Sequence, residues 1–117
     1  MFKGNPAKTL QNFSLAKQAV KEGGEYFEKK ERDYEFQNSV FFKARGENVT
    51  GLKISDDMKS MVTDDPEMFE DILATAFNTL KATLTEERTK AITERAKQLK
   101  LPNEIINAIS NGDITGI

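Results

Sequence analysis

The sequence predicts an α+β fold in which a helix, three antiparallel strands and a long C-terminal helix follow one another. Three observations predict it. Apolar residues recur every three or four positions from Ala7 to Val20, the apolar period changes to two from Asp33, and residues 63–67 form an acidic helix start that contains a proline. We expect one domain over residues 1–102, followed by a C-terminal extension over residues 103–117.

The first helix is predicted to begin at Asn5-Pro6, because an amide cap followed by proline is typical of a helix start. Its narrow apolar stripe suits packing against a single partner helix. Gly23 and Gly24 interrupt the stripe, and each glycine costs roughly 1 kcal/mol in a helix interior. We therefore expect a continued but weakened helix that ends near Glu31.

Three short strands are predicted where apolar and polar residues alternate, with turns at Asn38-Ser39 and at residues 46–48. The apolar members are Tyr34 and Phe36, then Val40, Phe42 and Ala44, then Thr50, Leu52 and Ile54. A long helix should start at Pro66 behind a carboxylate cap and run to about Lys100. Residues 103–110 are predicted to add a short helix closed by Gly112.

Composition excludes several classes of function. The chain has no cysteine and no histidine, so thiolate nucleophiles, imidazole bases and thiolate zinc sites are absent. Two acidic pairs, at residues 56–57 and 64–65, lack further oxygen ligands at calcium-loop spacing, and the second pair is explained as a helix cap. No phosphate-binding glycine loop is present. We expect no catalytic residues, no metal, no cofactor and no small-molecule substrate.

The N-terminal segment lacks the apolar core of a signal peptide, and no apolar run approaches the ~18 residues that span a membrane. A cytoplasmic protein without a membrane partner is expected. Formal net charge is −2, but its distribution is uneven. Residues 33–71 hold four Lys/Arg against ten Asp/Glu, whereas residues 1–32 hold seven against four. Basic ends can therefore contact phosphate while the acidic centre stays away.

The strongest candidates for phosphate contacts are Lys81, Arg88 and Arg95, which recur every seven residues and share one face of the long helix. The alternative is that Arg88 and Arg95 pair with Glu22, Glu25 or Glu28 of the first helix. Further candidates are the lysines that decorate both helices, each of which could equally be an ordinary solvated side chain. They are Lys8, Lys17, Lys21, Lys90 and Lys97.

Two motifs resemble the YbaB/EbfC family of small bacterial nucleoid-associated proteins. LKISDDM at residues 52–58 is similar to the strand end and acidic turn of that family, and DDPEMFEDILATAFN at residues 64–78 is similar to the start of its long helix. The resemblance spans roughly residues 5–102 and implies a tweezer-shaped homodimer whose helical arms bind double-stranded DNA in the nucleoid with limited sequence preference. The implied dimer and core positions are Val40, Phe42, Leu52, Ile54, Phe69, Leu73 and Phe77.

A dimeric protein-interaction module without significant DNA binding is the competing interpretation. The acidic sequence pI of about 5.3 supports it, as does the apolar tail, which could cover a partner. That tail consists of Ile105, Ile106, Ile109 and Ile114. An enzyme ranks third, because nothing orders the carboxylates and lysines into a site.

Overall fold

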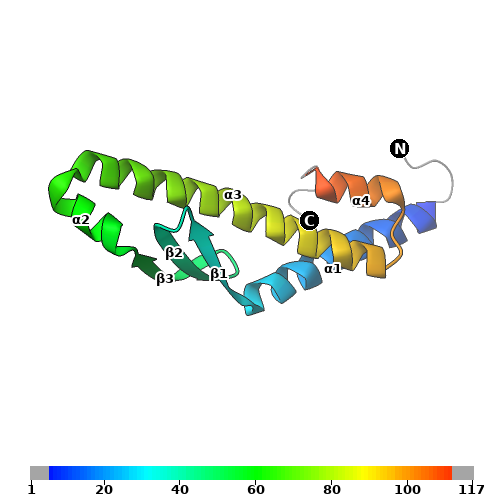
Figure 1. The fold of residues 1–117 in the computed structure, drawn as a ribbon. Helices are drawn as coiled ribbons and strands as arrows, with labels where there is room; N and C mark the ends of the chain where they lie inside the picture. Colours follow the sequence, from blue (N-terminus) through cyan, green and yellow to red (C-terminus); the bar gives the residue numbers. More distant parts are fainter. Residues whose placement is uncertain (1–5, 112–117) are drawn as a thin grey trace. The chain divides into compact units, whose positions relative to one another are not determined.

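The computed structural model describes residues 6–111, with side chains from Gln11 onward. It confirms the α+β class and the antiparallel three-stranded sheet (Figure 1). The elements are α1 (Pro6–Lys29), β1 (Glu31–Phe36), β2 (Val40–Arg45), β3 (Asn48–Ile54), α2 (Asp56–Asp64), α3 (Pro66–Gln98) and α4 (Asn103–Ser110). No helix within the described residues combines the length and the apolar character needed to cross a bilayer.

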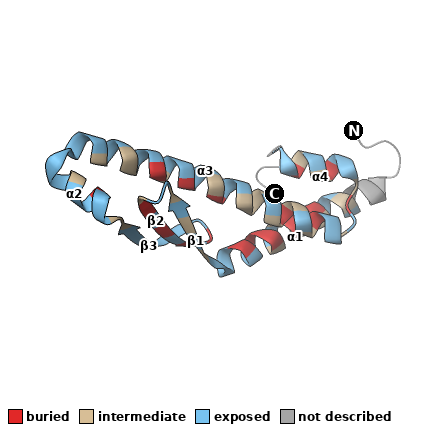
Figure 2. Ribbon diagram, in the orientation of Figure 1, coloured by how far each residue is buried: buried red, intermediate tan, exposed pale blue. Residues whose placement is uncertain are grey.

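The chain forms two compact units. The first, here called the sheet unit, comprises residues 28–85, and the second, the helical unit, comprises residues 1–27 together with residues 86–117. Helix α3 contributes its first part to the sheet unit and its last part to the helical unit. Each unit has its own set of buried residues (Figure 2).

In the sheet unit, the strand order is β1-β2-β3, and the central strand buries every second residue. Val40 and Phe42 are almost fully buried, and the Phe42 ring meets the Phe77 ring of α3 edge to face with 4.9 Å between centroids. A bulge between Lys43 and Ala44 shifts the register against β3. The sheet therefore packs one face against α3 through its middle strand.

The turn between β1 and β2 lies one residue earlier than expected. Gln37 and Asn38, rather than Asn38 and Ser39, occupy its centre with φ of 48° and 55°, and the Ser39 N–H donates to the Phe36 carbonyl at 2.9 Å. Two left-handed central residues are typical of the tight turn whose twist matches that of the strands. Asparagine tolerates this backbone region better than most residues, whereas Gln37 is an unusual occupant.

Helix α2 was not predicted, because the acidic pair Asp56-Asp57 was interpreted as a turn. Ser55 caps it by accepting a hydrogen bond from the Met58 N–H at 3.2 Å, and the two aspartates occupy its first turn, where they complement the helix dipole. Met58 is fully buried and anchors the helix to the sheet unit. The predicted start of α3 is confirmed, since Asp65 accepts a hydrogen bond from the Met68 N–H at 3.2 Å.

In the helical unit, α1 continues without a break through Gly23 and Gly24, as expected, and it ends at Lys29. A Cβ atom on Gly23 would lie 2.6 Å from Ile92 Cα, so the absence of a side chain lets α1 and α3 approach closely. Residue numbers rise along α1 as they fall along the facing part of α3, which makes the pair antiparallel. Gly23 is thus a packing residue, and the helix continues through both glycines.

The C-terminal end of α3 is capped by a residue with a left-handed backbone conformation. Lys100 has φ of 59°, its N–H donates to the Lys97 carbonyl, and the Leu101 N–H donates to the Ala96 carbonyl. This pattern is the Schellman motif, in which glycine is the usual left-handed residue. Helix α3 consequently ends at Gln98, two residues before the predicted end.

Helix α4 has the predicted bounds, while Gly112 lies outside the described residues. Ile105 and Ile109 of α4 are buried in one cluster with Leu101 and with residues of α1 and α3. The partners on α1 and α3 are Ala16, Ala19, Ile92 and Ala96. In the structure, α4 is therefore part of the core of the helical unit.

Candidate nucleic-acid interface

Arg95 of α3 is paired with Glu22 of α1. Its Nε donates to Glu22 Oε1 at 2.7 Å, and its Nη1 donates to Gln98 Oε1 at 2.9 Å. Gln18 Nε2 lies 3.2 Å from the same Glu22 oxygen and also donates to it. Hydrogen bonding from Arg95 lowers the pKa of Glu22 below its ordinary value of 4.5, because it stabilises the ionised form. Of the two roles considered for Arg95, the structure shows the pairing with Glu22.

Arg88 lies beside α1 as well. A Cβ atom on Gly24 would lie 3.4 Å from Arg88 Nη2, so the guanidinium lies beside the backbone of α1 at van der Waals distance from that position. The Arg88 side chain is half-buried. Arginine commonly buries its aliphatic stem in this way while its charged end stays near water.

The lysines of α1 that the structure describes are exposed. Lys17 and Lys21 are four residues apart and therefore share one side of the helix. The Lys17 ammonium lies 5.1 Å from the centroid of the Phe13 ring, itself half-exposed. The side chain of Lys8 lies outside the described residues.

Lys90 and Lys97 occupy one solvent-facing side of α3, seven residues apart. Each forms an ion pair along the helix, Lys90 with Glu86 at 3.5 Å and Lys97 with Glu94 at 3.6 Å. Exposed pairs of this kind contribute only about 0.3 to 0.5 kcal/mol. Phosphate can therefore replace the carboxylates at little energetic cost.

Charge is divided between the two units. The helical unit holds nine Lys/Arg against seven Asp/Glu, whereas the sheet unit holds eight against twelve. Seven of the eight predicted DNA-contacting residues belong to the helical unit, and Lys81, which is exposed, belongs to the sheet unit. The predicted basic face of α3 is thus divided between the units, and only its Arg88 and Arg95 lie against α1.

The predicted dimer residues divide by exposure. Val40 and Phe42 are buried inside the sheet unit, and the half-buried Phe77 packs on Phe42. Leu52 on the edge strand β3 is 50% exposed. Ile54, Phe69 and Leu73 are partly buried. The family resemblance implied all seven as dimer and core positions together, because a motif does not distinguish a side chain covered by its own helix from one left open at a sheet edge.

Other exposed apolar side chains of the sheet unit were not predicted as interface residues. They are Phe41, Val49, Val62 and Met68. The sequence did contain a signal that Phe41 is exposed. It directly precedes Phe42 in a strand whose side chains alternate, so the two phenylalanines lie on opposite faces of the sheet. The tail residues Ile105 and Ile109 are buried within the helical unit, and Ile114 lies outside the described residues.

Among residues 6–111, no three carboxylates come together in a way that could hold a metal ion. Comparison of the chain with protein-family models, with curated proteins and with solved structures gives no match.

Proposed function

We propose that the protein binds double-stranded DNA as a homodimer, through lysines of the helical unit, with limited sequence specificity. The observation that carries the proposal is the separation of charge: basic residues outnumber acidic ones in the helical unit and are outnumbered in the sheet unit. A polyanion is attracted to the first surface and repelled by the second. The resemblance of residues 52–78 to nucleoid-associated proteins supports the same function.

The contacts proposed are to phosphate. Lys17, Lys21, Lys90 and Lys97 end in exposed ammonium groups on two regular helices, and a lysine acts on phosphate as a point charge. Phosphate contacts position a protein on DNA but carry no sequence information directly. Weak sequence preference therefore follows from this choice of residues, and nucleoid localisation in the cytoplasm follows from binding of this kind.

Arg88 and Arg95 have a different role in this proposal. Arg95 pairs with Glu22, and Arg88 lies over Gly24, so both arginines position α1 against α3. They support the lysine-bearing surfaces indirectly. Replacing them with acids would disturb the helix pair itself, and loss of DNA binding in such variants would not identify a contact.

A dimer is part of the proposal because one helical unit has an excess of only two basic residues. Two copies double the number of phosphate contacts on one ligand. Leu52, with half of its surface exposed on the edge strand β3, supports pairing through the sheet unit. Val49 on the same strand is 43% exposed and extends this apolar edge.

The test is a DNA titration at several salt concentrations with a lysine-to-glutamine variant of the helical unit, K17Q/K21Q/K90Q/K97Q. Affinity of the unmodified protein should fall steeply with salt, because each phosphate contact releases counterions and contributes about −0.9 to the slope of log affinity against log salt. The variant should bind weakly and show a shallower slope.

The matched control is K29Q/K43Q/K53Q/K59Q, which removes the same number of positive charges from the sheet unit. It should keep most of the affinity. Equal loss in both variants would show that only total charge matters and would contradict the proposal. The dimer is tested separately by light scattering, where L52E should yield monomers.

A further inference from the structure

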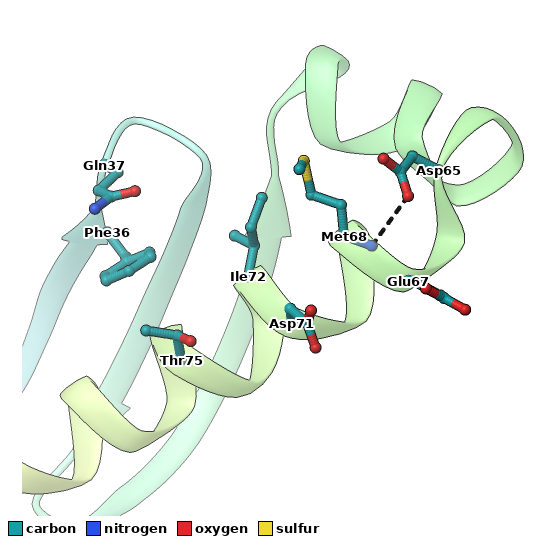
Figure 3. A pocket seen from close by; sticks show the side chains of 8 residues that line it. All are labelled: Phe36, Gln37, Asp65, Glu67, Met68, Asp71, Ile72 and Thr75. Carbon is teal, nitrogen blue, oxygen red and sulfur yellow. Dashed lines mark hydrogen bonds between the residues drawn. The ribbon is translucent and has the colours of Figure 1, made fainter.

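The sheet unit contains a groove of about 560 Å³ between the end of β1 and the first turns of α3 (Figure 3). Its apolar part is formed by Phe36, Met68 and Ile72. Met68 is 49% exposed, although it has one of the larger apolar side chains of the chain, and the other two are partly buried. The groove thus offers to solvent an apolar strip of the sheet unit, whereas the four lysines proposed to contact DNA belong to the helical unit.

The strip has a regular spacing. Met68, Ile72 and Thr75 follow one another on successive turns of α3, with Phe36 across from them (Figure 3). Residues at this spacing lie on one face of a helix and cover about 10 Å of its length. A groove of this form receives the apolar side chains of an amphipathic partner segment, which are themselves three or four residues apart.

The rim of the groove is acidic. Asp65, Glu67 and Asp71 line it, and Glu67 and Asp71 form a second stripe, four residues apart, beside the apolar one. The surrounding segment, residues 56–80, contains seven Asp/Glu and a single basic residue, Lys59. A ligand in this groove therefore lies beside three carboxylates, which attract positive charge.

We propose that this groove docks a segment of another protein that carries an apolar anchor flanked by lysine or arginine. Charge selects this occupant. The acidic rim repels DNA and anionic lipid. A second copy docked symmetrically through the same groove would bring the same carboxylates of both copies together, and they would repel each other. A basic amphipathic segment places apolar side chains on Met68 and Ile72 and positive charges beside Glu67 and Asp71. The inference is independent of DNA binding, because it uses the opposite charge and the other unit.

The test uses isotope-labelled full-length protein and a synthetic amphipathic peptide with leucines three and four residues apart flanked by lysines. Backbone amide signals of Asp65, of residues 67–75 and of Phe36 and Gln37 should shift on titration. The double variant E67Q/D71N should weaken binding roughly five- to tenfold, as expected from the loss of two exposed ion pairs. A control variant, E70Q, removes one charge from α3 outside the groove and should change affinity less than about twofold.

A second peptide with glutamate in place of lysine separates charge selection from simple apolar attachment, and it should not bind. Equal binding of both peptides, or unchanged affinity in E67Q/D71N, would overturn the proposal. So would shifts of the groove signals that depend on protein concentration without peptide, because a second copy would then be the occupant. Since E67Q/D71N leaves the lysines of the helical unit intact, its affinity for DNA should not fall, and that measurement distinguishes failure here from failure of DNA binding.

Discussion

The helical unit and the sheet unit hold their parts of α3 by different kinds of contact. In the helical unit, small residues such as Ala19 and Gly23 allow the backbones of α1 and α3 to approach closely. The ion pair between Arg95 and Glu22 links the same two helices. In the sheet unit, the large side chains Phe42 and Phe77 fill the space between strand and helix. The first arrangement depends on the absence of side-chain volume and the second on its presence.

This difference extends to the surfaces. The helical unit buries its apolar stripe against its own helices and leaves lysines outside, which suits a polyanion. The sheet unit leaves Leu52 half-exposed on its edge strand and Met68 half-exposed beside the carboxylates of Glu67 and Asp71, which suits protein partners. One short chain thus carries two surfaces of opposite chemical character.

The largest expected loss of stability comes from removing side-chain volume in the sheet unit. Phe42→Ala should lower the free energy of unfolding by about 3 to 5 kcal/mol, because it deletes a buried ring and its contact with Phe77. Phe41→Ala, on the neighbouring exposed position, should cost less than about 1 kcal/mol. Denaturant unfolding of both variants checks this, and similar losses would show that the two faces of the sheet are equally covered.

The next largest change in stability is expected from adding side-chain volume in the helical unit. Gly23→Ala should destabilise the protein by about 1 to 2 kcal/mol, because the new methyl group meets the Ile92 backbone, which cannot yield as a side chain does. Gly24→Ala meets only the flexible Arg88 guanidinium and should be neutral or stabilising by up to about 1 kcal/mol, since alanine favours the helix. Thermal unfolding of the pair separates close packing from helix propensity; a stabilising Gly23→Ala would refute the close contact.

A smaller effect concerns the end of α3. Lys100→Gly should stabilise the protein by about 0.5 kcal/mol, because it relieves a left-handed backbone costing roughly 1 to 2 kcal/mol while increasing the entropy of the unfolded chain. Lys97→Gly, in the right-handed last turn, should instead cost about 1 kcal/mol. If both changes moved the unfolding midpoint in the same direction, the left-handed conformation of Lys100 in the Schellman motif would be wrong.

The smallest effect is the pH dependence of the link between Glu22 and Arg95. The pKa of Glu22 is lowered in the folded state, so its stabilising contribution is fully present above the ordinary value of 4.5 and is lost as pH falls through the lowered pKa. Glu22→Gln should therefore be less stable than the unmodified protein at neutral pH, and the difference should shrink as the pH falls below 4.5. Denaturant unfolding over a series of pH values measures this, and a difference that stays constant as the solution is acidified would exclude the carboxylate as its cause.

Sequence reasoning recovered the elements whose signals are local. The cap and proline at residues 65–66 and the alternation in β2 were sufficient to predict α3 and the central strand. Helix α2 was missed although Ser55, followed by two acids and Met58, is a valid helix start; the acidic pair was assigned to a turn instead. Its single buried anchor, Met58, gives too little periodicity to detect.

The candidate site was harder to predict, because its chemistry depends on which residues face each other across the chain. A seven-residue spacing grouped Lys81 with Arg88 and Arg95, yet the two arginines lie against α1 and Lys81 belongs to the sheet unit. The glycines opposite Arg88 and Ile92 were the available signal. They were interpreted as weak points of a helix, and only a structure reveals that another helix passes there.

Lysine acetylation footprinting of the full chain with and without duplex DNA tests whether the two surfaces have different ligands. DNA should protect Lys17, Lys21, Lys90 and Lys97 from modification, while Lys43, Lys53 and Lys59 should react as before. Equal protection of both sets, or protection of the sheet-unit lysines alone, would show that the two surfaces do not differ in this way.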